Sequence, residues 1–170
     1  MDKYQEAYLE HIENKLKREQ TKTVYTNEER FGFYKVVRNR KSVRRFSGKE
    51  LDKPINEILN FSNKLAPSSC NRHGIYLQEV SPTYAEKVLV GGKNWVDKAE
   101  KVFFLFGAKE CYKNPKEIAF MPYLDAGHVS QNIQLVCEVE GIGCCFINPN
   151  VREPVGDDYF CGAIAVGDYD

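Results

Sequence analysis

The sequence has no excess of charge of either sign and no long apolar run. Its 170 residues include 24 Lys and Arg and 24 Asp and Glu, so the formal net charge is zero. Without net positive charge, the chain lacks the electrostatic footprint of a protein that binds nucleic acid or an anionic membrane. No apolar stretch is long enough to span a bilayer, and the charged, polar first residues do not form a signal peptide. We therefore expect a cytoplasmic protein that binds neither nucleic acid nor membrane.

The six cysteines lack the spacing of a metal site. None forms a C-x-x-C pair, Cys144 and Cys145 are adjacent, and Cys70 with His73 makes a C-x-x-H fragment without a matching second half. A cytosolic location also disfavours disulfides. We therefore expect no metal, and reduced thiols packed in the core.

The composition is that of a folded globular protein. Hydrophobic residues make up 42% of the chain, with ten Phe and ten Tyr, and the length suits one domain or one domain with an appendage. Residues 2–20 place apolar side chains at helical spacing, and a connector follows. We assign residues 1–26 to an N-terminal helical extension and residues 27–170 to the main domain.

Helical patterns recur along the main domain. Asn27 is predicted to cap a helix with an apolar face of Phe31, Val36 and Val37. A second helix begins after Asp52, near Pro54, and ends at residues 66–67. Its apolar stripe is predicted to contain Ile55, Ile58, Leu59 and Leu65.

The second half combines strands with helices. Residues 74–80 and 101–108 are predicted strands, the latter buried on both faces because its apolar run is continuous. Ser81-Pro82 opens a short helix between them, which Gly91-Gly92 breaks. A long helix is expected over residues 121–139, with Ile133, Val136 and Val139 facing inward and Gly141 as its stop. Two further strands are expected at residues 144–147 and 160–166. The pattern predicts an α+β fold.

A basic segment follows the first helix of the main domain. Residues 40–46 read Arg-Lys-Ser-Val-Arg-Arg-Phe. In an extended chain the side chains of Arg40, Ser42 and Arg44 point to the same side. Guanidinium groups and a hydroxyl suit a phosphate, although such basic segments are often solvated surface or nucleic-acid patches.

A turn motif follows about one helix later. Residues 66–71 read Ala-Pro-Ser-Ser-Cys-Asn. Such a turn can offer backbone N–H groups and an amide side chain to a flat heterocycle. Neither this motif nor the basic segment is decisive alone, but their order and spacing are informative.

Taken together, these motifs resemble the nitroreductase-like FMN-dependent oxidoreductase superfamily. The resemblance continues in Asp125-Ala126-Gly127, in Gln131-Asn132, in residues 141–147 and in residues 164–167, and it covers roughly residues 35–168. It implies a mixed, mainly antiparallel sheet flanked by helices, here with an extra N-terminal helix. It also implies a homodimer with FMN at the subunit interface.

The resemblance assigns roles to individual residues. Arg40, Ser42 and Arg44 would hold the FMN phosphate, and Lys41 would face the flavin. The flavin bound mainly by the other subunit would be contacted by the turn residues Pro67, Ser68, Ser69 and Asn71. His73 stands where the family often has Gln, and its charge varies with pH.

The segment after Gly143 would run along the flavin. It contributes Phe146, Ile147 and Asn148, with a backbone N–H near flavin N5. Pro149 has no N–H, so the donor would be Asn148 or a neighbour. We interpret Cys145 as a packing residue rather than a nucleophile, because no motif places a His near it.

The implied activity needs no catalytic side chain. NADH or NADPH would pass hydride to flavin N5, and a flat acceptor such as a nitroaromatic or quinone would then take the electrons, in ping-pong order. The alternative is a flavin-binding protein without reductase turnover, for flavin storage, sensing or use of reduced flavin. A nucleic-acid module built on residues 38–45 is a second alternative, which the zero net charge disfavours.

The ends of the chain differ from the family pattern. Relatives usually continue past the last strand into a tail that wraps the partner and adds cations to the phosphate site. We expect one or two of these cations to be missing unless Lys41, Arg45 or Arg152 compensates. We also expect the N-terminal helix to replace the tail in embracing the second subunit.

Overall fold

The structure is a computed structural model that describes residues 6, 9–10, 13, 23–116 and 118–170. The helix expected over residues 2–20 falls largely outside these residues, so the division of the chain at residue 26 stays a prediction. The described helices are α2 (Asn27–Asn39), α3 (Ile55–Leu65), α4 (Pro82–Val88) and α5 (Met121–Glu140), with short 3₁₀ turns η1 (Ser69–Asn71) and η2 (Val96–Lys98). The strands are β1 (Ile75–Val80), β2 (Lys101–Gly107), β3 (Gly143–Ile147) and β4 (Tyr159–Gly167).

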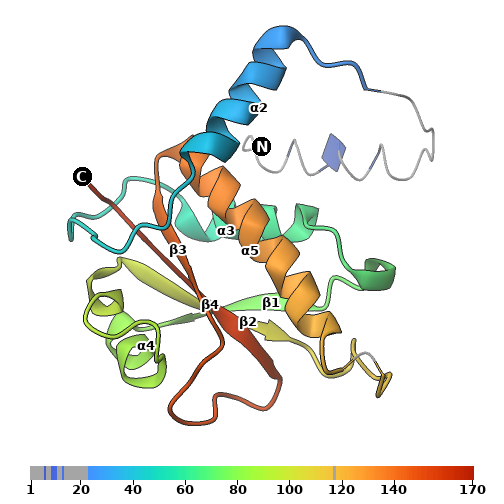
Figure 1. The fold of residues 1–170 in the computed structure, drawn as a ribbon, viewed down its shortest axis with the longest axis vertical. Helices are drawn as coiled ribbons and strands as arrows, with labels where there is room; N and C mark the ends of the chain where they lie inside the picture. Colours follow the sequence, from blue (N-terminus) through green and yellow to red (C-terminus); the bar gives the residue numbers. More distant parts are fainter. Residues whose placement is uncertain (1–5, 7–8, 11–12, 14–22, 117) are drawn as a thin grey trace.

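The strands form one four-stranded sheet in the order β1-β2-β4-β3 (Figure 1). All three strand pairings are antiparallel, with β2 and β4 in the centre and β1 and β3 at the edges. Helices α3 and α5 cover one face, and α4 with η2 covers the other. The predicted α+β class, with a mainly antiparallel sheet flanked by helices, is confirmed.

Strand β2 is buried on both faces, as its continuous apolar sequence predicts. Phe103 and Leu105 pack into the cluster under α3 and α5. Their neighbours Val102, Phe104 and Phe106 pack into the cluster on the α4 side. This alternation is the period-two geometry of a strand.

The apolar stripe predicted for α3 is confirmed in its first turns. Ile55, Ile58 and Leu59 are buried, and the helix ends at Leu65, before Pro67. The helix begins at Ile55 with Pro54 as its N-cap, so Asp52 lies outside it.

Helix α5 is the long helix expected from the sequence, and it ends at Gly141, which has φ 67°. Ile133 is buried as predicted, but the prediction that Val139 faces inward is wrong, because this side chain is 65% exposed. Six residues rotate a helix by about 240° beyond a full turn, which turns Val139 away from the face that contains Ile133. Cys137, four residues after Ile133, fills the inward position. No helix in the described part of the chain is long and apolar enough to cross a bilayer.

Helix α2 projects from the body of the molecule (Figure 1). Its N-cap is Thr26 and not Asn27, because Thr26 and Glu29 form a reciprocal capping box. The predicted apolar face is present but uncovered in the described chain. No residue of α2 is buried, and Phe31 is 73% exposed.

Candidate functional site

The basic segment runs along the edge of the sheet after α2. Val43 is buried, and its N–H donates to the carbonyl oxygen of Cys144 on edge strand β3 at 3.0 Å. Further on, the N–H of Ser47 donates to the carbonyl oxygen of Asp168 at 2.9 Å. These bonds hold the segment extended. Ser42 and Arg44, the residues before and after Val43 in the chain, are exposed.

Cys145 lies beneath the polar side chains of this segment. The Ser42 hydroxyl is hydrogen-bonded to its thiol, and the guanidinium groups of Arg44 and Arg40 act on it electrostatically. Arg40, Ser42 and Arg44 therefore all act on this one thiol, and Arg40 also acts on the thiol of the neighbouring Cys144. We call these three residues the cation cluster.

Burial raises the pKa of the Cys145 thiol above its ordinary value, although Arg44 and Ser42 favour the thiolate. A buried, protonated thiol is a poor nucleophile. This environment fits the interpretation of Cys145 as a packing residue.

Arg40 is also tied to the core helix. Its Nη1 donates to Oε1 of Gln134 on α5 at 3.2 Å. The guanidinium is half-buried and oriented, which reduces the entropy that it would lose on binding an anion.

The other cations expected near the phosphate lie in different surroundings. The Lys41 ammonium sits 5.1 Å from the centre of the Tyr169 ring, and Arg45 is exposed. Arg152 donates from Nη1 to the carbonyl oxygens of Glu86 and Lys87 at the end of α4, both at 2.8 Å. Arg152 therefore caps α4 and does not add to the cation cluster within the chain.

The turn motif has an unusual backbone. Cys70, Asn71 and His73 have φ values of 53°, 56° and 48°, in the left-handed region that favours glycine. Each non-glycine residue in this region adds about 1–3 kcal/mol of backbone strain to the folded state. The turn is fixed by its own hydrogen bonds: the His73 N–H donates to Ser68 Oγ at 2.9 Å, and His73 Nε2 lies 2.9 Å from Asn71 Oδ1.

These bonds present polar groups at the surface in a set arrangement. Pro67, Asn71 and His73 are exposed, while Ser68 and Ser69 are half-buried. Cys70 is exposed, so the expectation that the cysteines pack in the core is wrong at this position. It occupies a tight turn that has no interior to fill.

Two residues that support this turn received no role in the sequence analysis. Asp125 on α5 is fully buried, and its Oδ1 accepts from both the N–H and the Oγ of Ser69, each at 2.9 Å. Its Oδ2 accepts from the Tyr112 hydroxyl at 2.8 Å. Burial and this bond raise the pKa of Tyr112 well above its ordinary value. The sequence signals Asp125 only as part of the Asp125-Ala126-Gly127 motif, which carries the resemblance but no role, and it gives no signal for Tyr112.

The cation cluster and the turn lie against different parts of α5. Arg40 contacts Gln134, whereas Ser69 contacts Asp125. Nine residues of helix separate these two contacts, which corresponds to about 13 Å along the axis. Within one chain, the two sequence motifs therefore do not meet at a single point (Figure 1).

The segment after Gly143 places few side chains at the surface. Ile147 is buried in the α4-side cluster, Phe146 is half-buried, and Asn148 is exposed. Of the three residues predicted to line the flavin, Ile147 can therefore offer a ligand only its backbone.

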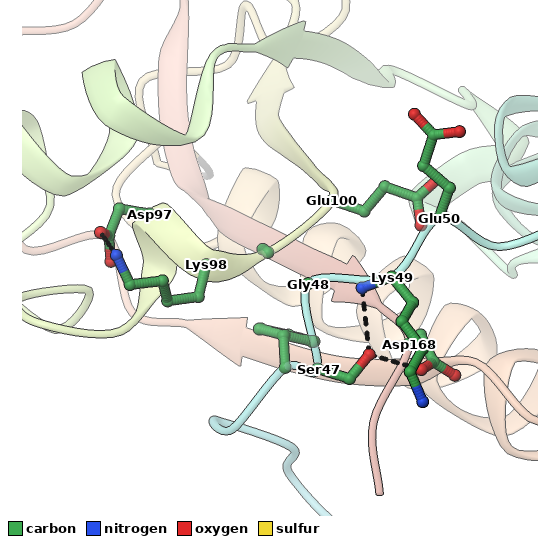
Figure 2. Close-up of a pocket in the computed structure, with 10 residues that line it drawn as sticks. Ser47, Gly48, Lys49, Glu50, Asp97, Lys98, Glu100 and Asp168 are labelled. Carbon is green, nitrogen blue, oxygen red and sulfur yellow. Dashed lines mark hydrogen bonds and ion pairs between the residues drawn. The ribbon is translucent and has the colours of Figure 1, made fainter.

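A separate hollow of about 410 Å³ follows the cation cluster along the chain (Figure 2). It is lined by residues 46–50 and 97–100 and by Asp168. Four of these residues, Glu50, Asp97, Glu100 and Asp168, are acidic and two, Lys49 and Lys98, are basic, and the negative balance disfavours a phosphate in this hollow. The Ser47 hydroxyl donates to the Asp168 carboxylate at 2.5 Å across it. In the described residues, no three His, Cys, Asp or Glu side chains are grouped so as to hold a metal ion.

The fold can be compared with solved structures. A nitroreductase family protein from Streptococcus pneumoniae superposes with a TM-score of 0.68 and 17% identity, over 81% of this chain and 90% of that one. A candidate NADH dehydrogenase/NAD(P)H nitroreductase from Parabacteroides distasonis gives 0.67 and 22%, over 80% and 86%. A candidate nitroreductase from Desulfovibrio desulfuricans, solved in complex with FMN, gives 0.65 and 17%, over 79% and 84%.

Comparison by sequence gives a different result. No family model matches the chain, and no curated protein does. At identities of 17–22%, the structural likeness establishes the architecture. The chain therefore has the nitroreductase-like fold, as the sequence motifs predicted.

Proposed function

We propose that the protein is an FMN-dependent NAD(P)H oxidoreductase. In this proposal hydride passes from NADH or NADPH to flavin N5, and the electrons then go to a flat acceptor such as a nitroaromatic or a quinone. The observation that carries the proposal is the cation cluster on a nitroreductase-like fold, one example of which was solved with FMN.

The cation cluster fits a phosphomonoester. Arg40 and Arg44 supply charge and Ser42 a hydroxyl, and all three act on one buried thiol. An arginine can bind phosphate with two parallel hydrogen bonds, which positions as well as attracts the group. Lys41 lies between Arg40 and Ser42 in the chain, with its ammonium 5.1 Å from the centre of the Tyr169 ring.

The turn fits the flavin ring. Asn71 carries an amide that can both donate and accept, and its Oδ1 is already held by His73. Pro67 offers a flat apolar surface, and Ser68 and Ser69 add polar groups beside it. The exposed Asn148 lies at the end of β3, where its backbone N–H would serve as the donor near flavin N5.

We propose further that the site is completed by a second copy of the chain. The turn and the cation cluster are about 13 Å apart along α5, and a two-fold dimer would bring the turn of one protomer to the cluster of its partner. The exposed apolar side chains support this arrangement. On α2 and just before it they are Val24, Tyr25, Phe31, Phe33, Tyr34 and Val37, and on α5 they are Tyr123, Leu124 and Val139. Such a set marks a protein interface.

In this arrangement, the protein supplies position and a water-excluding surface, while the flavin supplies the redox chemistry. The acceptor would take up a hydride and one further proton, which solvent would supply, so the proposal assigns no side chain to proton transfer. The cation cluster fixes one end of the cofactor, and the turn fixes the face on which nicotinamide and acceptor alternate.

Steady-state oxidation of NADH and NADPH with a soluble quinone tests the proposal. The FMN-loaded protein should turn over with ping-pong kinetics, and Arg40→Ala should lower activity at limiting FMN. Lys49→Ala is the matched control, because Lys49 is an exposed cation outside the cluster. Tight FMN binding without turnover would favour flavin storage or sensing, and absence of FMN binding would refute the proposal.

A further inference from the structure

Asp125 is an acidic side chain without solvent exposure. Its carboxylate accepts three hydrogen bonds, two from Ser69 and one from Tyr112, and all three donors are uncharged. Burial of a carboxylate is unfavourable unless its oxygens are well satisfied. Such a costly group in the core points to a role that an apolar residue cannot perform.

The segment that Asp125 holds is the turn with three left-handed residues, Cys70, Asn71 and His73. Ser69 opens the 3₁₀ turn η1, immediately before the first of them. Asp125 accepts from both the backbone N–H and the side-chain hydroxyl of Ser69, so the entry to the turn is fixed in position and in direction.

Tyr112 holds the exit of the same turn. A Cβ on Gly74 would lie 2.8 Å from the Tyr112 ring and 2.7 Å from Cys111, so this part of the chain lies directly on the ring. The Arg72 guanidinium sits 5.7 Å from the centre of the same ring. Asp125 and Tyr112 are hydrogen-bonded to each other. Together they hold both ends of the turn, Asp125 at its entry and Tyr112 at its exit.

We propose that Asp125 and Tyr112 are positioning residues that hold the 67–73 turn in its strained form before any ligand binds. The inference rests on the proposed function, since the ligand presented to the turn is the flavin ring. A preformed turn reduces the conformational entropy lost when the ring binds. Neither residue touches the cofactor; both act through Pro67, Ser69 and Asn71.

Three variants test this role. Tyr112→Phe removes one donor to Asp125 and keeps the ring under Gly74. Asp125→Ala removes the acceptor for all three donors, and Asp125→Asn retains an oxygen that can still accept from Ser69. The matched control is Tyr76→Phe, because Tyr76 also donates to an aspartate, Asp158, at 2.8 Å, and its ring packs on the other face of the sheet, beside Phe106.

The first measurement is hydrogen exchange of the amides of residues 68–73 in the protein without flavin. Asp125→Ala and Tyr112→Phe should speed exchange there, and Asp125→Asn should restore most of the protection. The second measurement is FMN affinity together with the visible circular dichroism of bound FMN. We expect Asp125→Ala and Tyr112→Phe to weaken binding by about tenfold and to change the dichroism, whereas Tyr76→Phe should change neither.

Unchanged exchange in both Asp125→Ala and Tyr112→Phe would overturn the inference. So would faster exchange that leaves FMN affinity and dichroism unaltered, because the pair would then have a structural role only. If Asp125→Ala does not fold, Ser69→Ala replaces it, since this half-buried residue loses one of the two bonds and keeps the other. Wild-type protein that binds no FMN would refute the proposed function, while the exchange result would still decide whether Asp125 and Tyr112 fix the turn.

Discussion

A shared site between two protomers predicts that two defective chains can complement each other. One chain carries Arg40→Ala with Ser42→Ala and lacks the phosphate contacts. The other carries Ser68→Ala with Asn71→Ala and lacks the turn contacts. In a heterodimer of the two, one site combines two defective halves and the other combines two intact halves.

The expected losses follow from the bonds removed. A charge-assisted bond contributes about 1.5–3 kcal/mol and a neutral one about 1 kcal/mol. Loss of Arg40 and Ser42 should therefore weaken FMN binding by about 3 kcal/mol, or roughly 150-fold. Loss of Ser68 also frees the His73 N–H that it holds at 2.9 Å. Together with loss of Asn71, it should weaken binding by about 2 kcal/mol, or roughly 30-fold.

The assay is a fluorescence titration of FMN with a heterodimer isolated through two different affinity tags. Each parental homodimer should bind FMN weakly at both sites. The heterodimer should bind about one FMN per dimer with wild-type affinity, because one of its two sites is intact. A heterodimer whose titration is the simple average of the two parents would refute the shared site and place each flavin within one chain.

Three further predictions concern single positions. Arg44→Ala should weaken FMN binding about fivefold and reduce its salt dependence, whereas Lys49→Ala should do neither. The measurement is an FMN titration of both variants at low and at high salt. If the two variants weaken binding equally, the cluster is not specific. Gly162→Ala should lower the free energy of unfolding by about 3 kcal/mol in urea denaturation, because its φ is 125° and a Cβ would lie 2.7 Å from a β3 carbonyl oxygen; wild-type stability would show that β4 can shift there. Burial and a hydrogen bond to Asp158 raise the pKa of Tyr76 from 10.0 to about 12. The folded state then keeps a proton that the unfolded state loses, so this contribution to stability is complete below pH 10 and is lost as pH rises towards 12. In Tyr76→Phe, the free energy of unfolding measured with urea should fall less steeply as pH rises above 10. An unchanged slope would contradict the assignment.

The sequence predicts the fold because its local patterns agree with one another. The apolar run over residues 101–108 predicts a strand that is buried on both faces. The helices that pack on those faces have apolar stripes of their own. Local geometry likewise predicts that Ser42 points to the same side as Arg40 and Arg44, because alternation in an extended segment requires no knowledge of distant residues.

Features that depend on distant contacts could not be predicted. The bond between Tyr112 and Asp125 joins a loop to the inner face of α5, and no periodicity marks it. The role of Arg152 depends on the end of α4 lying beside it, about 65 residues earlier in the chain. Thr26 rather than Asn27 caps α2, because both residue types are good caps and only the reciprocal bonds with Glu29 decide between them.

The measurement that most directly tests the central claim is the visible spectrum of the purified protein after FMN is added and excess flavin is removed. NADH is then added without oxygen, followed by NADPH in a parallel sample. We predict a spectrum of protein-bound oxidised flavin that bleaches with one of the two donors and returns when a quinone is added. Protein that retains no FMN, or whose bound flavin neither donor bleaches, would contradict the assignment of an FMN-dependent NAD(P)H oxidoreductase.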